Sequence, residues 1–467
     1  SSAASDVYKR QDQPAPSRGE PRELTLAVGA PAHGGHCVAR PVDDPGGRVI
    51  FVRHALPGET VRARLTEMTS RTWRADAVEI LQASPDRVES VWPEAGPAGV
   101  GGGELAHVAL DAQRTWKRWV LADCLRRIGG QEVADAVAAL PEASAAAAVP
   151  IEPMPTDAAA QASNSARRRA LAGTATRTRV SLTVGEDGRP GMHAFRSGTV
   201  LPLRRLPLAV EAITEIGLLE RSRWRAHYRP GMRIEAIAPS GGEPVVLLDE
   251  RLLTAQARST GRRRVREVVD ASALGLGELT YSVHAEGFWQ VHVDAPRVLV
   301  ERVVRGALGA DLDGAAGSRV LELYSGAGLF TLPLAALVGS GGEVVSLEGN
   351  EQAVRDARRT LHDQPSARLA SGRVSARSVR ELAGSLTGGR PDVVVLDPPR
   401  QGAGREVIEA VGALGAERIV LVACDPAALA RDLGTLLRSG YALGSMSALD
   451  MFPHTHHFET IAVLERS

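Results

Sequence analysis

The stretch VLELYSGAGLFTLPLAALVGSGGEVVSLEGN (residues 320–350) decides the fold of the chain. A short apolar strand leads into a turn that contains Gly326 and Gly328, and an apolar helix follows from about Phe330. A second apolar strand then ends at Glu348. Glycines in such a turn let backbone N–H groups approach a ligand, and a carboxylate that ends the next strand can accept hydrogen bonds from ribose hydroxyls. The stretch therefore predicts a nucleotide-type cofactor site.

The glycine turn is shorter than the dinucleotide fingerprint GxGxxG, because Phe330 and Thr331 stand where a third glycine would come. This difference disfavours a pyrophosphate and favours a nucleoside cofactor such as S-adenosylmethionine. A glycine-containing turn in another kind of doubly wound sheet is the alternative, and the motif alone does not exclude it.

The composition bounds the class of protein. The chain has 467 residues, which is enough for two to four domains, and its 55 basic residues balance its 55 acidic residues. No bulk attraction to nucleic acid or membrane follows from that balance. Lys9 and Lys117 are the only lysines, so almost every basic residue is an arginine, which suits phosphate binding and also a GC-rich genome.

Cysteine usage and hydropathy predict the compartment. Cys37, Cys124 and Cys424 lie far apart without a CxxC pair, which argues for a reducing compartment and against a disulfide framework or a cysteine-rich metal site. No signal peptide and no apolar run of about 18 residues is visible, so we expect a cytoplasmic protein without a membrane partner. Nothing in the sequence demands more than a monomer.

The first structured segment has the pattern of a small barrel. Residues 1–22 lack periodicity and are expected to be a disordered tail. From residue 23 to about residue 84, short alternating strands are separated by turn residues, as in a closed OB-like barrel. Such a barrel can bind single-stranded nucleic acid, protein or nothing, and its pattern does not choose among these.

The middle of the chain is harder to interpret. Residues 109–127 have helical periodicity, with a predicted buried stripe of Trp116, Trp119, Val120 and Leu125. Arginines cluster at 167–169, at 221, 223 and 225, and at 262–264. Each cluster could bind phosphate, although a run of charge is usually a solvated face.

The last third alternates strands and helices, which predicts a mainly parallel sheet with helices on both faces. A buried strand (DVVVL) ends beside Asp397, and the next strand (RIVLVA) ends beside Cys424. Parallel sheets place ligands beyond the carboxyl ends of their strands, so these residues should share an edge with the glycine turn. A thiol there can be a nucleophile, and it can equally be a small core residue.

A cluster of acids and histidines lies near the C-terminus, in the stretch ALDMFPHTHHFETIAVLE. Asp450, His454, His456, His457 and Glu459 invite a metal interpretation, but their spacing fits no standard zinc pattern. We predict no metal site.

Five motifs together resemble the RNA 5-methyluridine (uracil-C5) methyltransferase family. They are GFWQVH, LELYSGAGLFTLPLA, VVVLDPPRQGAG, LVACDPAALARDL and DMFPHTHHFET, and they keep their order and spacing over nearly all of residues 287–466. The phrase VIFVRHALPGETVRARL also resembles a TRAM domain, an OB-like RNA-binding barrel. With RTRVSLTV and GMHAFRS, the resemblance extends to most of the chain from Glu23.

The resemblance implies an α/β fold with three structured parts. The first is an N-terminal OB-like TRAM barrel over 23–84. The second is a small mixed α+β central RNA-binding domain over 85–280, whose helix at 109–127 could dock on the catalytic domain. The third is a Rossmann-like class I methyltransferase domain over 281–467. The partner implied is ribosomal or transfer RNA with its target uridine single-stranded or flipped out, because duplex RNA hides its bases.

The resemblance also implies a mechanism and a set of site residues. By motif match Cys424 is the nucleophile that adds to C6 of uracil, and Glu459 is the base that removes the C5 proton. S-adenosylmethionine would be held by Gln290, Tyr324, Gly326, Gly328 and Glu348, with Asp397 at the boundary between cofactor and uracil.

Four features of this chain depart from the family pattern. Many relatives carry four cysteines for an iron–sulfur cluster, and the matching stretch VWPEAGPAGVGGGELAH has none, so we predict no cluster and an ordinary helical Cys124. Leu329 replaces an asparagine in the glycine turn, which puts one cofactor contact in doubt. Ala423 and Asp425 replace a serine and an asparagine beside Cys424, and Asp425 is expected to raise the pKa of the thiol.

Two other functions stay open from the sequence alone. One is a methyltransferase of the same fold that acts on another base or on a small molecule. The other is an RNA-binding protein of this fold that has lost catalysis, for which Leu329, Ala423 and Asp425 are the only support. The sequence does not indicate which RNA or which uridine is the target.

Overall fold

The computed structural model describes residues 23–143, 148–312 and 314–467. The chain divides into two compact units, Ser1–Arg87 and Val88–Ser467, and each is described by itself. The predicted tail over 1–22 lies outside the described residues. Among the described helices, none has the length and apolar character needed to cross a membrane.

The first unit is a closed barrel of five strands in the order β1-β2-β3-β5-β4. The strands are β1 (Glu23–Ala32), β2 (His36–Pro41), β3 (Ile50–Arg53), β4 (Thr60–Met68) and β5 (Trp73–Gln82). Buried and exposed residues alternate along β4, so its apolar side chains fill the barrel. Within the barrel Arg53 donates two hydrogen bonds of 2.8 Å to the Asp76 carboxylate, which satisfies both buried charges.

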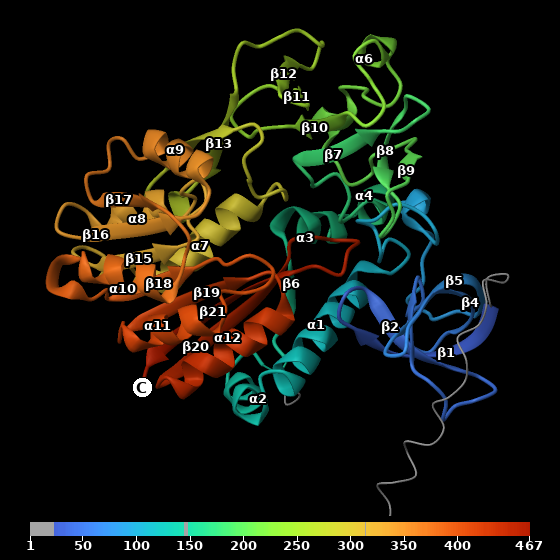
Figure 1. The fold of residues 1–467 in the computed structure, drawn as a ribbon, viewed down its shortest axis with the longest axis horizontal. Helices are drawn as coiled ribbons and strands as arrows, with labels where there is room; N and C mark the ends of the chain where they lie inside the picture. Colours follow the sequence, from blue (N-terminus) through green and yellow to red (C-terminus); the bar gives the residue numbers. More distant parts are fainter. Residues whose placement is uncertain (1–22, 144–147, 313) are drawn as a thin grey trace, which may run out of the picture. The chain divides into compact units, whose positions relative to one another are not determined.

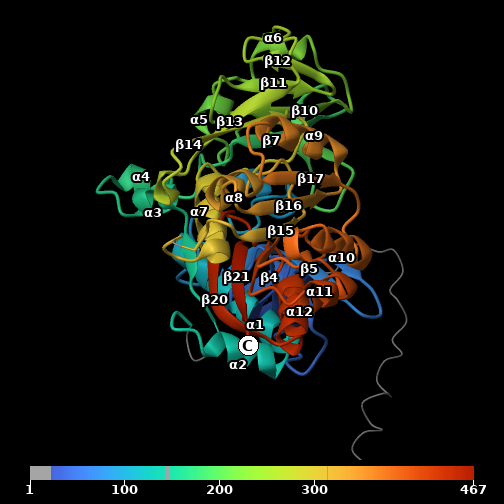
Figure 2. The ribbon, with the colours of Figure 1, turned by 90° about the vertical axis from the view of Figure 1, so that its left-hand side faces the viewer.

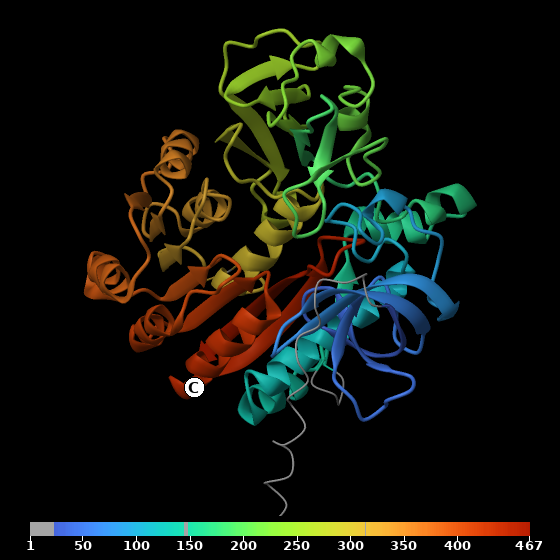
Figure 3. The ribbon, with the colours of Figure 1, turned by 45° about the vertical axis from the view of Figure 1, so that its right-hand side comes forward.

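The second unit begins with a largely helical segment and a separate antiparallel sheet. The first elements are η1 (Pro93–Ala95), α1 (Leu110–Arg127), α2 (Gln131–Ala138), β6 (Ile151–Pro153), α3 (Pro155–Gln161) and α4 (Ala166–Ala170). The sheet has the order β12-β11-β10-β7-β8-β9, and Figure 3 shows it in green and yellow as a layer distinct from the orange and red strands. Its members and the short helices between them are β7 (Arg179–Val184), β8 (Pro190–His193), β9 (Val200–Pro202), α5 (Glu211–Thr214), α6 (Ser222–Arg225), β10 (Arg233–Ile237), β11 (Val245–Leu248) and β12 (Arg251–Thr254).

A two-stranded hairpin connects this sheet to the last part of the chain. It consists of β13 (Arg264–Asp270), η2 (Ser272–Leu274) and β14 (Glu278–His284), and α7 (Ala295–Leu308) follows it. Tyr281 of the hairpin is wholly buried and donates a 2.9 Å hydrogen bond to the carbonyl of Leu329 in the glycine turn. The hairpin therefore packs directly against the predicted cofactor edge.

The large sheet has eight strands in the order β17-β16-β15-β18-β19-β21-β20-β6. Its strands β15 to β19 are parallel, and β21 runs antiparallel between β19 and β20. The elements are β15 (Arg319–Leu323), α8 (Thr331–Val338), β16 (Glu343–Glu348), α9 (Glu351–Thr360), β17 (Ala367–Ser371), α10 (Ala376–Gly384), η3 (Thr387–Gly389), β18 (Val393–Leu396), α11 (Arg405–Ala413), β19 (Arg418–Ala423), α12 (Pro426–Arg438), β20 (Tyr441–Asp450) and β21 (Glu459–Arg466). The predicted doubly wound α/β fold is confirmed.

Helices cover both faces of this sheet, as Figure 1 shows. One core contains side chains of α7 and α8 with alternate strand residues such as Val320 and Val395. The opposite core contains side chains of α11, α12, α1 and α2 with the intervening residues such as Leu321 and Leu396. Because parallel strands are buried on both faces, their sequences are continuously apolar rather than alternating.

The last strand of the sheet comes from far upstream. The three residues of β6 pair in parallel with residues 448–450 of β20, and α1 packs against α12 in the adjoining core. This part of the chain thus completes the sheet, although the predicted boundary between residues 280 and 281 stays a prediction.

One prediction about α1 is wrong. Trp116, Val120 and Leu125 are buried, but Trp119 is 37% exposed. The buried face of the helix also includes Lys117, because its side chain pairs with Asp450 at the end of β20. Periodicity places Trp119 almost opposite that face of the helix.

Candidate active site

The predicted site residues lie at the carboxyl ends of four parallel strands. Tyr324, Gly326 and Gly328 follow β15, and Glu348 ends β16. Asp397 follows β18 and Cys424 follows β19, while Glu459 begins the antiparallel β21 beside them. This is the edge at which open α/β sheets place their ligands.

The glycine turn has the backbone conformation that such a site requires. Gly326 has φ +54° and Gly328 has φ +87°, a region that favours glycine. A Cβ atom at Gly326 would meet no atom within 4 Å, so the turn leaves open space in front of its backbone. Tyr324 also has a positive φ of 64°, and its N–H donates to the Leu347 carbonyl at 2.8 Å, which ties the turn to β16.

The Glu348 carboxylate lies over this turn. Its Oε2 atom accepts a hydrogen bond from the Gly326 N–H at 2.9 Å, and its Oε1 atom accepts one from the Asn350 N–H at 2.6 Å. Each carboxylate oxygen keeps a further lone pair for another donor. The arrangement orients the carboxylate toward the open side of the turn.

Glu322 is a further acid at this edge, and the sequence analysis did not identify it. Its side chain is 1% exposed, Oε2 accepts a 2.6 Å hydrogen bond from Thr331, and Oε1 has no partner among the described residues. Burial, followed by the nearby carboxylates of Asp397 and Glu348, raises the pKa of Glu322 to about 8. The available signal was a lone glutamate inside an otherwise apolar strand.

Cys424 and Glu459 come together because β19 and β21 are neighbours. Ala423 pairs with Thr460 in the antiparallel ladder, and the Thr460 hydroxyl donates a 2.7 Å hydrogen bond to the Ala423 carbonyl. Cys424 and Glu459 therefore leave adjacent positions of two paired strands, and their side chains interact electrostatically. A thiol and a carboxyl thus share one site.

The thiol of Cys424 is protonated in the resting protein. Burial raises its pKa to about 12, and the carboxylates of Glu459 and Asp397 act in the same direction. The positive charge of Arg400 opposes them. Asp425 was expected to raise this pKa. The pKa is raised, and Glu459 and Asp397 are the principal charges that raise it, while Asp425 accepts hydrogen bonds from the N–H groups of Ala427 and Ala428 as the N-cap of α12. A contribution of Asp425 to the pKa stays a prediction.

Two buried carboxyls beside the thiol influence each other. Burial, followed by the charge of Asp397, raises the pKa of Glu459 well above its usual range, and Arg400 again opposes the shift. Burial and the charge of Glu348 raise the pKa of Asp397 to about 7. The Oε1 atom of Glu459 has no hydrogen-bond partner among the described residues. Burial therefore favours the protonated form of both carboxyls over the charged form.

Gln290 is the predicted site residue that the structure does not link to the others. It is buried in the segment between β14 and α7, and its side chain makes no hydrogen bond with a described residue. Its amide group keeps its donors and acceptor for another partner.

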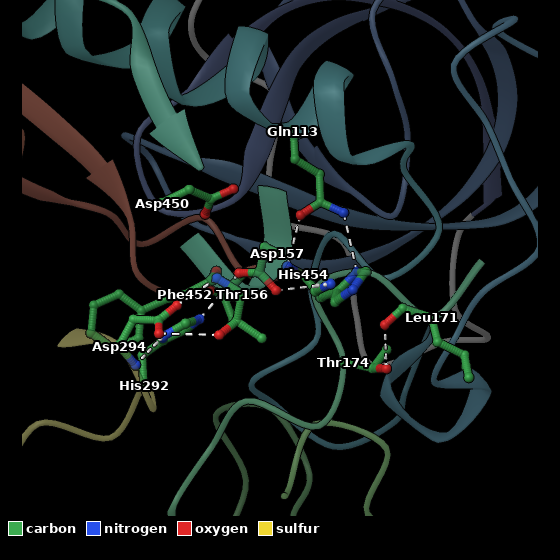
Figure 4. A network of polar contacts seen from close by, with 12 residues as sticks. Gln113, Thr156, Asp157, Leu171, Thr174, His292, Asp294, Asp450, Phe452 and His454 are labelled. Atoms are coloured by element: carbon green, nitrogen blue, oxygen red, sulfur yellow. Dashed lines mark hydrogen bonds and ion pairs between the residues drawn. The ribbon is translucent and has the colours of Figure 1, made fainter. Parts of the chain in front are cut away.

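The loop before Glu459 is held by α1, as Figure 4 shows. The wholly buried Lys117 donates to the Asp450 carboxylate and, at 3.0 Å, to the Phe452 carbonyl. The buried Gln113 accepts from the His454 N–H at 2.7 Å and contacts the ring of His454 with its amide nitrogen at 3.1 Å. These contacts fix both the start and the middle of the 450–458 loop.

A histidine and a glutamate form a long ion pair near the end of this loop. The Nδ1 atom of His456 lies 3.8 Å from the Oε2 atom of Glu104, and neither atom has a hydrogen-bond partner in the described chain. Burial would raise the pKa of Glu104, but its interaction with His456 and the backbone N–H of Gly102 lower it to about 2. Burial lowers the pKa of His457 to about 3, so that ring is neutral.

These contacts bear on the metal interpretation of the C-terminal cluster. Asp450 pairs with Lys117 and His454 pairs with Gln113, so the two side chains serve separate partners. Among the residues that the structure describes, no group of three or more His, Cys, Asp or Glu side chains is arranged to hold a metal ion. The predicted absence of a metal and of an iron–sulfur cluster stays a prediction.

Leu329 and Ala423, which depart from the family pattern, lie at positions where the backbone carbonyl makes the local contact. Leu329 is buried and its carbonyl accepts the Tyr281 hydroxyl, while the Ala423 carbonyl accepts the Thr460 hydroxyl. Neither contact depends on the side chain of the residue, so leucine and alanine are compatible with this backbone.

Comparison with known proteins identifies the family. The model of the tRNA (Uracil-5-)-methyltransferase family matches residues 277–467, and that of the TRAM domain matches residues 20–78. A Streptomyces avermitilis protein named an uncharacterized RNA methyltransferase is 38% identical over 95% of this chain and 98% of its own. The 23S rRNA (uracil(1939)-C(5))-methyltransferase RlmD of Acinetobacter baumannii (strain AB0057) is 30% identical over 93% of this chain and 92% of its own. The chain belongs to the RNA uracil-C5 methyltransferase family.

One solved structure resembles this methyltransferase over nearly its whole length. The Pyrococcus abyssi tRNA (uracil-54, C5)-methyltransferase, solved with S-adenosyl-L-homocysteine, shares 20% identity with a TM-score of 0.60 over 96% of this chain and all of that chain. At that identity the likeness shows the fold. The protein is an S-adenosylmethionine-dependent enzyme that methylates C5 of uracil in RNA, and it carries a TRAM domain.

The residues of the methyltransferase fit this cofactor. S-adenosylmethionine carries a positive sulfonium and a positive ammonium group, and Glu322, Glu348 and Asp397 interact electrostatically at the glycine turn. Glu322 Oε1 is buried without a partner in the described residues, which leaves an acceptor for a cationic or hydrogen-bonding ligand. A positive ligand offsets the mutual repulsion of these carboxylates.

The ion pair of Lys117 with Asp450 yields a stability prediction. Lys117→Met is expected to lower the free energy of unfolding by about 3–5 kcal/mol, because it leaves the Asp450 carboxylate buried without its charged partner. The double variant Lys117→Met/Asp450→Leu should regain most of that loss. Urea unfolding followed by tryptophan fluorescence measures both effects.

Arg126→Met on the same helix is the control, because its side chain is 64% exposed. It should change stability by less than about 0.5 kcal/mol. Equal losses in the single and double variants would show that the two charges are not coupled.

Proposed function

We propose that the enzyme methylates C5 of uridine through a covalent adduct in which Cys424 is the nucleophile and Glu459 is the base. The observation that supports this assignment is the pairing of β19 with β21, which brings a thiol and a buried carboxyl into electrostatic contact at the ligand edge of the sheet. Asp397 interacts with both groups there. The substrate is ribosomal or transfer RNA.

The reaction requires a nucleophile that adds to C6 of uracil and a base that later removes the C5 proton. Uracil C5 is a poor nucleophile, so the Cys424 thiolate adds to C6, a C6–S bond forms, and C5 gains the electron pair needed to attack. The cofactor, when bound, supplies a methyl group made electrophilic by its sulfonium. Once C5 carries that methyl group, Glu459 removes the C5 proton, the C5–C6 double bond re-forms, and the C6–S bond breaks to release the thiolate.

The cofactor is proposed to bind across the glycine turn. Gly326 and Gly328 allow close approach to the backbone, and Glu348 can accept hydrogen bonds from ribose hydroxyls. Tyr324 and Gln290 are proposed as further cofactor contacts, and Asp397 as the group between cofactor and uracil. Glu322 is added to this set as a buried carboxyl behind the turn.

The uracil is proposed to enter beside the C-terminal loop. Three buried atoms there make no hydrogen bond within the described residues: Glu459 Oε1, and His456 Nδ1 and Glu104 Oε2, which lie 3.8 Å apart as an ion pair. Buried polar atoms are normally satisfied, so an edge of a uracil with its two carbonyls and its N–H is a suitable complement. A base reaches such a buried position only from a single strand or after flipping out of a helix.

The protonation states of the resting site bear on how the reaction begins. Burial, with the Asp397 carboxyl beside them, raises the pKa values of Cys424 and Glu459 and so favours the protonated form of each in the resting site. A cationic ligand next to these groups favours their ionised forms. We infer that the thiolate forms after the ligands bind, which protects the free thiol from oxidation.

A covalent trap tests the proposal. RNA that contains 5-fluorouridine should form a stable adduct with the wild-type enzyme in the presence of cofactor, because fluorine cannot leave C5 as a proton does. The adduct appears as a shifted band on a denaturing gel and should be absent in Cys424→Ala. A 23S ribosomal RNA transcript that contains 5-fluorouridine is the first RNA to test, because the sequence relative from Acinetobacter baumannii is named for 23S ribosomal RNA. A transfer RNA transcript with the same substitution forms the second series.

The control for this experiment is Cys124→Ala, which removes a buried thiol of the same unit whose pKa is likewise raised to about 12 by burial. It should leave the adduct intact. Turnover that persists in Cys424→Ala would favour a methyltransferase with another mechanism or substrate. Cofactor binding without any adduct on either RNA would favour an RNA-binding protein without catalysis.

Glu348 provides a separate test of the cofactor site. Glu348→Ala should weaken binding of S-adenosylhomocysteine about 10- to 100-fold, because hydrogen bonds to a charged group contribute about 1.5–3 kcal/mol. Isothermal titration calorimetry measures the affinity. Glu351→Ala, an exposed acid in the first turn of α9, is the control and should bind as the wild type does. An unchanged affinity in Glu348→Ala would exclude this carboxylate from the cofactor site.

Arg400 should control the pH dependence of turnover. Activity rises with pH as Glu459 loses its proton, and the charge of Arg400 lowers the pKa values of both Glu459 and Cys424. Arg400→Gln removes that charge, so the ascending limb of the rate profile should move to higher pH by up to about one unit. Rates with saturating RNA between about pH 6 and about pH 10 measure the shift.

Arg431→Gln serves as the matched control, because Arg431 acts on Asp432 and Cys124. Its pH profile should coincide with that of the wild type. A profile of Arg400→Gln that is lower at every pH but not displaced would mean that Arg400 acts in RNA binding alone.

A further inference from the structure

The arginine cluster at 167–169 lies on a helical hairpin that has no role in the proposed reaction. The hairpin consists of α3 and α4, which are joined by residues 162–165. Figure 2 shows it projecting from the neighbouring elements of the second unit. No residue of α4 is buried, so packing does not account for its sequence.

The charge of this hairpin is uncompensated. Arg167, Arg168 and Arg169 are exposed, and none of them makes an ion pair with a described carboxylate. Arg169 donates a 2.7 Å hydrogen bond to the Ser163 carbonyl, which orients one guanidinium along the hairpin. Residues 158–185 contain no aspartate or glutamate, although the whole chain is neutral. A solvated helix face usually mixes both signs of charge.

The root of the hairpin is rigid. The buried Asp157 at its start accepts a hydrogen bond from the Gly173 N–H at 3.1 Å, so the two ends of the hairpin are joined. The second oxygen of Asp157 contacts His292 Nε2 at 3.1 Å. Thr156 donates its N–H and its hydroxyl to Asp294 at 2.7 and 3.1 Å. Figure 4 shows these contacts around the root.

The same root touches the loop that leads to Glu459. A Cβ atom at Gly173 would lie 2.8 Å from His454 Nε2 and 3.0 Å from Pro453, so the backbone of the hairpin is packed directly on that loop. Gly173 has φ +78°, which also favours glycine. The exposed arginine cluster therefore lies on a hairpin whose root, at Gly173, packs on the loop that leads to the proposed base.

We propose that the α3–α4 hairpin is an RNA-binding arm in which Arg167, Arg168 and Arg169 bind the phosphates that flank the target uridine. The inference rests on the proposed function, because it takes the uridine to lie beside Glu459. Guanidinium groups bind phosphate oxygens in a bidentate manner, and a rigid root limits the entropy lost on binding. The arm supplies affinity that the neutral chain as a whole lacks.

The test is the triple variant Arg167→Gln/Arg168→Gln/Arg169→Gln. Its affinity for a labelled unmodified 23S ribosomal RNA transcript should fall about tenfold or more at low salt, and the slope of log Kd against log salt should decrease by about 2, since each phosphate contact contributes about 0.7–0.9. The KM for RNA should rise, while kcat at saturating RNA, the affinity for S-adenosylhomocysteine and the thermal transition stay at wild-type values. A transfer RNA transcript is tested in parallel.

Two further variants separate phosphate binding from other effects. The triple Arg→Lys variant keeps the charge, so it should retain most of the salt dependence while it loses part of the affinity. Arg358→Gln/Arg359→Gln/Arg377→Gln makes the same change of charge on exposed positions of α9 and α10 and should bind RNA as the wild type does.

Either of two results would overturn the inference. An unchanged affinity and salt slope for both RNAs in the Arg→Gln hairpin variant would show that the arm does not bind RNA. An equal loss in the α9–α10 control would show that net charge, rather than this hairpin, determines binding. Because these measurements do not require methyl transfer, they can succeed or fail independently of the covalent trap on Cys424.

Discussion

The buried ion pair between Lys117 and Asp450 is the interaction on which the geometry of the site depends. An ammonium group without solvent must find a carboxylate, so α1 cannot move away from the end of β20 without a large cost. The same helix holds the 450–458 loop through Gln113 and His454. Together these contacts set where β21 begins, and Glu459 is its first residue. The helix before the catalytic sheet thus determines the position of a side chain more than 300 residues later.

A second constraint is the crowding of carboxyls at the ligand edge. Burial is the main cause of the raised pKa values of Glu322, Asp397 and Glu459. The charges of Asp397 and Glu348 add to it for Glu322, that of Glu348 for Asp397, and that of Asp397 for Glu459. Such an arrangement disfavours the ionised forms in the free protein and becomes favourable beside a cation. The cofactor of this family carries that charge, so the electrostatics of this edge and the chemistry of the ligand are complementary. The positive charge of Arg400 acts in the opposite direction and lowers the pKa values of Cys424 and Glu459.

Much of this site was readable from the sequence because its signals are local. Glycines after one strand, an acid at the end of the next, and Asp397 and Cys424 after two more must meet at one edge once the strands are parallel. Trp119 was wrongly expected in the buried stripe of α1, and the burial of Lys117 was not predicted, because burial of a charge depends on its partner and Asp450 lies 333 residues away from Lys117. Glu322 was missed for a related reason: an apolar strand pattern does not reveal which member turns toward other acids.

The position of β6 has a consequence for how the chain acquires its structure. Residues 151–153 form the outermost strand of a sheet whose other members come from the last third of the sequence, so this segment has no partner until β20 has been synthesised. A recombinant fragment that starts after the central sheet would leave the backbone groups of β20 unpaired at an open margin, which invites self-association. The catalytic half of the molecule is therefore a poor candidate for isolation by truncation. Residues 151–153 can pair in the sheet only after residues 448–450, nearly 300 positions later, have been made.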